Sequence, residues 1–358
     1  MLLGIVVHAG SFVAGFQTPD ENWVDNTVLI TAILVHNFRM PAFFAIAGLF
    51  AAMLIDQRGL TGFWQQRTRR LLWPLIVAAF TVIPLTESIS FADLSSPQKF
   101  IEAGFMHMWF VYYLLIFSAI TIAVYWSAHK TQFGRRKHEL VKAIGRKWLS
   151  NPLTLFALAA ISFLLPAYFD NDSGALEKDS SYLPNIYLLL FYGIFFSLGL
   201  LSYFIWQTIE VKLRDRWWLY VLIGGTSFTI YTVLLFSESG HSWLKFFYTI
   251  STWMLAAGFI AVFLKFANKP NKFFTYFSDA SYWIYIVHLP IVVATLFWLT
   301  KWQVSLGWSF VLSIVVGFSV STLTYQWFVK DTFIGTFLAG KIGQNKSKKS
   351  GRNKKVRR

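Results

Sequence analysis

The chain has 358 residues, of which 56% are hydrophobic and 14% are charged, and its formal net charge is +15. Soluble domains carry about 25% charged residues, so this chain has too few to cover a surface exposed to water. A soluble enzyme, a disordered protein and a disulfide-rich secreted scaffold are excluded, the last because the chain has no cysteine. The composition therefore predicts an integral membrane protein with several spans.

Ten apolar segments are long enough to cross a bilayer, for which a helix needs about 20 residues. They are continuous apolar runs, unlike the short alternating strands of a transmembrane barrel. We therefore expect an all-α, polytopic helical bundle with spans at residues 1–16, 27–55, 71–89, 105–127, 152–169, 185–206, 217–237, 244–264, 281–299 and 308–328.

Lysine and arginine lie almost entirely in one alternating set of connections. Of the 32 basic residues, 27 lie in residues 56–70, 128–151, 207–216, 265–280 and 329–358. Connections with this positive charge stay in the cytoplasm, so we expect both termini there. The membrane accounts for the net charge, and we expect lipids rather than nucleic acid as its partner.

The organisation predicted is one transmembrane domain, residues 1–330, followed by a cytoplasmic tail, residues 331–358. From Lys341 onward the tail is basic and low in complexity, which is typical of a disordered segment attracted to anionic lipid. The first span has only 16 residues before Gln17 and no basic residue in front of it. We therefore expect the first helix to be truncated at its N-terminus.

Polar residues inside spans are the first candidates for a functional site, because burying them in lipid is costly. His8 lies in the first span and shares one helix face with Gly4, Ser11 and Gly15. Small residues let neighbouring helices approach, so we expect His8 to point into the bundle. A histidine that only bonds across a helix interface is the alternative.

The second span carries His36 and Arg39 on one face, with Pro41 close behind. Arg39 keeps its proton and needs an anion or a wet cavity. Pro41 deprives the carbonyl of Asn37 of its helical donor and is expected to kink the helix. A broken, charged helix often lines a cavity, so we expect Arg39 to face a ligand, with a structural ion pair as the alternative.

Three arginines, Arg67, Arg69 and Arg70, precede the third span, and Arg67 shares a face with Arg70 if the helix begins there. A guanidinium group binds phosphate through paired, charge-assisted hydrogen bonds. The ordinary positive charge that flanks a span is the alternative explanation.

The ninth span has a polar face formed by Ser278, Ser281, Tyr285 and His288. Of these, His288 lies too deep to belong to an interfacial belt. At the start of the fourth span we interpret Trp109 as part of such a belt and His107 as facing an outer acceptor. No zinc-binding or nucleotide-binding motif occurs, and we expect no bound metal.

Several of these segments, in the same order, resemble the acyltransferase-3 family of membrane enzymes, and within it the glucan biosynthesis protein C group. The resemblance rests on His8, Phe38–Phe44 with Ala47–Phe50, Arg67–Arg70 before Pro74, His107–Phe110 and Ser281–Pro290. It covers nearly all of the predicted spans.

The resemblance implies an enzyme of the bacterial cytoplasmic membrane that moves a succinyl or acetyl group from cytoplasmic acyl-CoA to hydroxyls of a periplasmic glucan or surface polysaccharide. Acyl-CoA would be the donor substrate, and no permanently bound cofactor is expected. His8 matches the essential histidine of the family, and Arg67 with Arg70 matches its RxxR motif. The family also has an arginine or lysine eleven residues before that histidine, a position that precedes Met1 here.

The chemistry of acyl transfer assigns roles to the polar residues. Histidine, with a pKa near 6.5, suits removal of the proton from a sugar hydroxyl, which contributes about 10²–10⁴-fold in rate. We expect His8 to be this base, with Arg39, Tyr285 and His288 as further catalytic residues, because the developing oxyanion needs a donor. The predicted binding residues are Arg67 and Arg70 for acyl-CoA, and His36, His107, Trp109 and Ser281 for the substrate.

Two other classes of function stay open at this point. A transporter or flippase would use the same cavity, with Arg39 and the broken helix at Pro41. No convincing repeat relates residues 1–170 to residues 171–358, which counts against a transporter. The third class is a structural partner in polysaccharide export.

Overall fold

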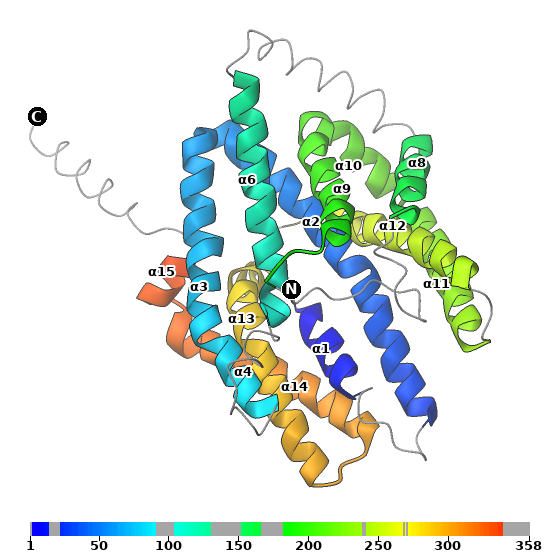
Figure 1. The fold of residues 1–358 in the computed structure, drawn as a ribbon, viewed down its shortest axis with the longest axis vertical. Coiled ribbons are helices and arrows are strands. Elements are labelled where there is room, and N and C mark those ends of the chain that lie inside the picture. The colour runs from blue at the N-terminus through cyan, green and yellow to red at the C-terminus, as the bar shows by residue number, and fades with distance from the viewer. Residues whose placement is uncertain are drawn as a thin grey trace, which may run out of the picture.

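The computed structural model describes residues 2–13, 22–90, 104–129, 152–165, 182–237, 241–267, 269 and 271–338. In this part of the chain every element is a helix, as Figure 1 shows. The elements are α1 (Leu3–Val13), α2 (Asn22–Arg67), η1 (Thr68–Leu72), α3 (Trp73–Phe80), α4 (Val82–Ser90), η2 (Met106–Met108), α6 (Trp109–His129), α8 (Pro152–Phe163), α9 (Ile186–Ser202), η5 (Tyr203–Ile205), α10 (Trp206–Asp215), α11 (Trp217–Phe236), α12 (His241–Phe266), α13 (Lys272–Lys301), α14 (Leu306–Thr324), η6 (Tyr325–Val329) and α15 (Phe333–Leu338).

The described helices have the lengths and surfaces of a membrane protein. Seven helical segments are long and apolar enough to cross a membrane, and α1 is a shorter apolar helix. Large apolar side chains such as Phe80, Trp308 and Trp327 are exposed on the outer faces, where lipid replaces water as the solvent. The predicted all-α, polytopic class is confirmed, while the number of ten spans stays a prediction.

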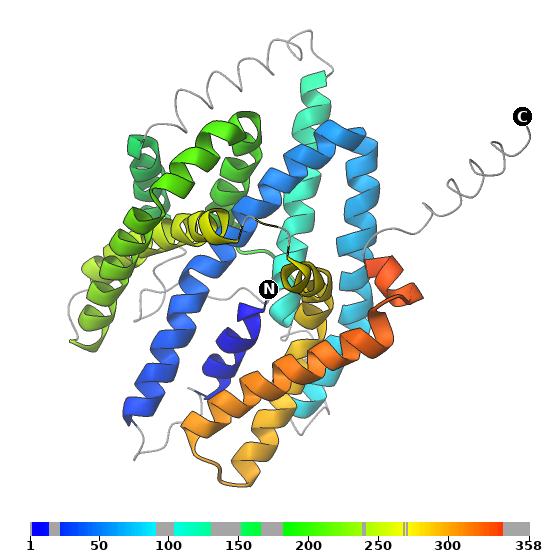
Figure 2. The same ribbon diagram turned by 180° about the vertical axis from the view of Figure 1, so that it is seen from behind.

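The first predicted inner connection, residues 56–70, is helical rather than open, because α2 runs on to Arg67 and η1 follows it. The chain reverses at Gly59, whose φ of 67° lies in the region that only glycine adopts at little cost. Figure 2 shows this reversal within α2, after which the chain runs on through η1 into α3. α2 continues through Pro41, since packed helices in a membrane tolerate proline, and the kink expected there stays a prediction.

Two further boundaries differ from the predicted ones. α13 begins at Lys272, well before residue 281, because Asn271 caps it: the Asn271 side chain accepts the N–H of Phe273 at 2.9 Å. Helical structure also continues into the predicted tail as α15, and residues 339–358 lie outside the described part.

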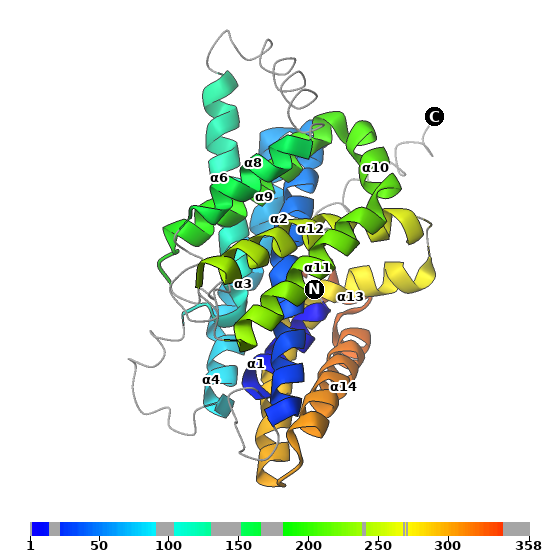
Figure 3. The ribbon, with the colours of Figure 1, turned by 90° about the vertical axis from the view of Figure 1, so that its right-hand side faces the viewer.

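Close helix packing positions α2 at the centre of the bundle. A Cβ atom at Gly48 would lie 1.9 Å from the carbonyl oxygen of Phe196, so α2 and α9 meet through their backbones. On another face of α2, the buried Asn37 donates its Nδ2–H to Ser251 Oγ of α12 at 2.9 Å. α1 packs against α2, α13 and α14, an arrangement that Figure 3 shows from the side.

Candidate active site

Three histidines from distant parts of the sequence meet inside the bundle. His8 comes from α1, His107 from η2 and His288 from α13. The ring centroids of His8 and His288 are 5.2 Å apart, those of His107 and His288 5.4 Å, and those of His8 and His107 6.1 Å. His107 is 4% exposed and His288 1%, so two of the three rings are shielded from the surroundings of the protein.

A proline in α13 fixes the ring of His107. Pro290 has no N–H, so the carbonyl of Ile286, four residues earlier, lacks its helical donor. Nε2 of His107 lies 3.2 Å from that carbonyl oxygen. Because a carbonyl can only accept, Nε2 carries the proton, and Nδ1 of the neutral ring has a lone pair.

His288 is fixed by its own helix. Its Nδ1 lies 2.8 Å from the carbonyl oxygen of Tyr285 and 3.1 Å from that of Ile284, so Nδ1 carries the proton and Nε2 has the lone pair. Both lone-pair nitrogens, Nδ1 of His107 and Nε2 of His288, are buried and have no hydrogen-bond partner among the described residues. The cluster therefore contains two nitrogens that are able to accept a proton.

The hydroxyl of Tyr285 adds a further link between α13 and the start of α6. It donates to the backbone carbonyl of His107. This bond and the one from His107 to Ile286 run in opposite directions between the same two segments. Together they hold η2 against α13, so that the histidine cluster rests on a backbone that is fixed on both sides.

Arg39 of α2 lies beside the cluster, and Gly4 of α1 makes room for it. A Cβ atom at Gly4 would lie 3.0 Å from Nη1 of Arg39 and 3.4 Å from Nε2 of His288. The small face predicted for α1 thus brings the guanidinium group and the imidazole close to the same point of the α1 backbone. Gly15, the last residue of that predicted face, lies outside the described residues.

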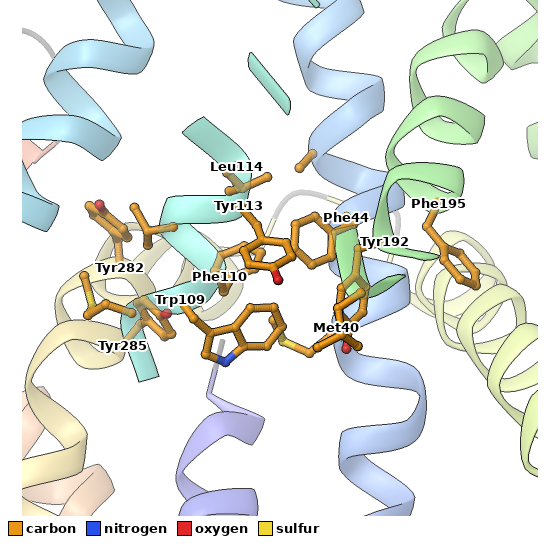
Figure 4. Close-up of a cluster of buried hydrophobic side chains, with 14 of the residues drawn as sticks. Met40, Phe44, Trp109, Phe110, Tyr113, Leu114, Tyr192, Phe195, Tyr282 and Tyr285 are labelled. Carbon is orange, nitrogen blue, oxygen red and sulfur yellow. The ribbon is translucent and has the colours of Figure 1, made fainter. Parts of the chain in front are cut away.

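These side chains enclose a pocket of about 20 Å³, room for about one water-sized group. Its walls are polar, basic and aromatic, and none of the described lining residues is acidic: they are His8, Arg39, Met40, Phe43, His107, Trp109, Phe110 and Tyr285. Figure 4 shows Trp109, Phe110 and Tyr285 converging with Met40 above the end of α1. The guanidinium group of Arg39 would stabilise a negative charge that develops in this pocket, and no carboxylate among these lining residues would oppose it.

A second cavity of about 550 Å³ adjoins this pocket. Phe43 and Phe110 line both spaces, and their rings meet edge to face with centroids 4.4 Å apart. This pair of rings is therefore the wall between the two. The other residues around the larger cavity are Ile46, Ala47, Phe50, Met53, Leu54, Gln66, Arg67, Arg70, Leu71, Val111, Leu114, Ser278, Ser281 and Tyr282.

Arg67 and Arg70 give the larger cavity its positive charge. Both line it, as their predicted shared face requires. The guanidinium group of Arg67 lies over the ring of Phe63 at 5.0 Å, while Arg70 is exposed. The turn between them belongs to the π-helix η1, a distortion that is frequent at functional sites. The cavity thus has two cations in its lining, Arg67 on the ring of Phe63 and the exposed Arg70, and most of its other lining residues are apolar.

Most predicted site residues lie in this region. His8, Arg39, His107, Trp109 and Tyr285 line the pocket, His288 packs against His8, and Arg67, Arg70 and Ser281 line the larger cavity. His36 lines neither space. The interpretation of Trp109 as an interfacial belt residue is wrong, because Trp109 is only 7% exposed and packs on Tyr113 and Tyr192.

Four lining residues were not among the predicted site residues: Met40, Phe43, Phe110 and Gln66. A helical signal was present for two of them, since Phe43 follows Arg39 by four residues and Phe110 follows His107 by three. In the described part of the chain, no group of three or more histidine or carboxylate side chains is arranged to hold a metal ion.

The sequence is similar to a known protein family and to named relatives. Residues 1–326 match the model of a family described as "Acyltransferase domain". Glucans biosynthesis protein C of Salmonella paratyphi A is 25% identical over 312 residues, covering 82% of this chain and 79% of the relative. The protein of the same name from Salmonella schwarzengrund is 23% identical over 360 residues, covering 95% and 92%. No solved structure matches the chain.

Proposed function

The chain belongs to this acyltransferase family, and we propose that it transfers a succinyl or acetyl group from acyl-CoA to hydroxyl groups of a glucan. It is a multi-pass protein of the bacterial inner membrane. One observation carries the proposal: a pocket lined by His8, His107 and Arg39, with His288 packed against His8, adjoins a cavity lined by two further arginines, Arg67 and Arg70. The first space suits proton transfer and the second suits a phosphate-bearing donor.

The donor would enter the larger cavity. Coenzyme A carries several phosphate groups, which Arg67 and Arg70 would bind through charge-assisted hydrogen bonds. The apolar walls below the arginines suit the rest of the donor. For its thioester to reach the histidines, the donor must pass Phe43 and Phe110, because this pair separates the two spaces.

The reaction is a direct transfer. An oxygen of the glucan hydroxyl attacks the thioester carbonyl carbon, and the base takes the hydroxyl proton. The C–S bond then breaks, so that the products are the glucan ester and coenzyme A, whose sulfur is protonated. We assign the base to His8. The rings of His107 and His288 pack against it, and each has an unprotonated nitrogen that is able to accept a proton.

Arg39 would stabilise the negative charge that develops on the carbonyl oxygen. It lines the same pocket as His8, and no acidic side chain among the described lining residues competes for it. Loss of a single oxyanion donor costs about 10²–10³ in kcat, so Arg39 would have a large effect. With a succinyl donor, Arg39 is also the candidate partner of the distal carboxylate.

Purified protein in detergent tests this function. We would incubate it with labelled succinyl-CoA or acetyl-CoA and a periplasmic glucan, and detect the glucan ester by mass spectrometry. Ester formation without a sealed compartment is the expected result, and the preferred donor identifies the acyl group. A transporter would form no ester with either donor, and that result would overturn the proposal.

A further inference from the structure

A third cavity lies on a different side of α2 from the histidine pocket. It has a volume of about 220 Å³ and is bounded by α2, α9, α10, α11 and α12. It shares no lining residue with the two cavities described above. Acyl transfer as proposed makes no use of it, so its chemistry needs its own explanation.

The walls of this cavity are almost entirely apolar. The buried rings of Phe195 of α9 and Trp253 of α12 line it with centroids 4.3 Å apart, and Ala42 and Ala45 of α2 line it as well. Ser202 and Tyr220 are the uncharged polar contributors. A small ion has nothing to gain from such walls, whereas a hydrocarbon chain does.

The charged lining residues, Lys212 and Arg216, are both basic and lie one helical turn apart. Ile209 and Leu213 of α10 also line the cavity at the same spacing. α10 therefore presents an apolar edge and a basic edge to the same opening, and Arg216 is exposed there. The distribution of lysine and arginine along the chain predicts that residues 207–216 lie on the cytoplasmic side of the membrane.

We propose that this cavity binds one anionic phospholipid, with an acyl chain between α9, α11 and α12 and the phosphate at Lys212 and Arg216. An anionic phospholipid matches both parts of the site. Its acyl chain would contact the apolar walls, and its phosphate would bind the basic pair Lys212 and Arg216. Basic pockets between transmembrane helices on the cytoplasmic side bind anionic lipid head groups. The bound lipid would press on Ala42 and Ala45 and so support α2 from the side opposite Phe43.

The test uses the full-length protein, delipidated in a neutral detergent. Phosphatidylglycerol is added, its binding is followed by native mass spectrometry, and the unfolding midpoint is measured in parallel. We expect one tightly bound phosphatidylglycerol and a rise in the midpoint, with phosphatidylcholine at least about tenfold weaker. Equal binding of the two lipids would overturn the proposal.

Variants locate the site. Lys212→Gln with Arg216→Gln is expected to weaken phosphatidylglycerol binding at least about tenfold. The matched control, Arg58→Gln with Lys330→Gln, removes the same charge from exposed residues outside the cavity and is expected to bind normally. Equal loss in both double variants would show attraction to net charge alone and would contradict the site.

A head-group analogue separates a lipid from a free phosphate. Glycerol 3-phosphate offers the anion without the chains, and we expect it to leave the unfolding midpoint unchanged. A rise equal to that given by phosphatidylglycerol would assign the cavity to a soluble anion and overturn the lipid proposal. Neither readout depends on acyl transfer, so the result stands apart from the proposed function.

Discussion

The guanidinium group of Arg39 lies beside Gly4 of α1, in space that a larger side chain at position 4 would occupy. A Cβ atom at position 4 would stand 3.0 Å from Nη1 of Arg39, closer than most carbon–nitrogen contacts allow. The same atom would stand 3.4 Å from Nε2 of His288. A single hydrogen in place of a methyl group therefore decides how closely the cation and the imidazole approach α1.

Gly4→Ala is expected to shift Arg39 and to lower kcat, by less than the 10²-fold or so that a displacement of about 1 Å would cost, because the new contact at 3.0 Å needs only a small movement. Folding should be retained, since alanine favours the helix. Acyl transfer by the purified variant is the measurement. Gly225→Ala is the control, because a Cβ there has nothing within 4 Å. Equal activity of both variants would exclude a role for this close approach.

Pro290→Ala tests the link between the proline and His107. The restored N–H at position 290 would compete with Nε2 of His107 for the Ile286 carbonyl. Loss of one hydrogen bond of about 1.4 kcal/mol corresponds to about a tenfold lower rate. The unfolding midpoint should stay level or rise, because proline destabilises a helix interior. A variant with a normal rate would show that this bond does not position the cluster.

Hydropathy alone predicted the helical class and most helix positions, because the bilayer sets the length of an apolar span. It failed at the start of α13: the eight residues Lys272–Asp279 were assigned to a basic connection, yet they are helical and Asn271 caps them. It also failed between Asp56 and Arg70, where Gly59 reverses the chain without a loop.

The candidate site was predictable residue by residue but not as an arrangement. The free-energy cost of burying a polar side chain in lipid pointed to His8, Arg39 and His288 individually. Their convergence depends on how α1, α2 and α13 pack, which no local pattern encodes. Trp109 shows the limit of a local pattern, because an aromatic residue at the start of a span is typical of a belt, and here it is buried.

Phe110→Ala is expected to open the wall between the two spaces. Water would then reach the thioester, so hydrolysis of acyl-CoA without glucan should rise relative to transfer. The measurement is release of free coenzyme A with and without acceptor. Phe80→Ala is the control, since Phe80 is 77% exposed on the outer face of α3. An unchanged ratio of hydrolysis to transfer would contradict the role of this ring pair.

Arg70→Gln should weaken donor binding without changing the chemical step. Loss of a charge-assisted hydrogen bond to phosphate raises KM for acyl-CoA about 10–100-fold, with kcat nearly constant. A short thioester without phosphates should react equally with variant and wild type. Arg58→Gln removes a charge from an exposed residue outside the cavity and serves as the control. A fall in kcat alone would place Arg70 elsewhere in the mechanism.

The most direct measurement is the ester content of cell-envelope glucan in cells whose only copy carries His8→Gln. If this imidazole removes the hydroxyl proton, esterification falls by about 10²-fold or more while the protein inserts at normal levels. Cells with Thr31→Ala, a residue whose hydroxyl donates to the Thr27 carbonyl of its own helix at 2.8 Å, should match wild type. A normal ester content in the His8→Gln cells would contradict the account.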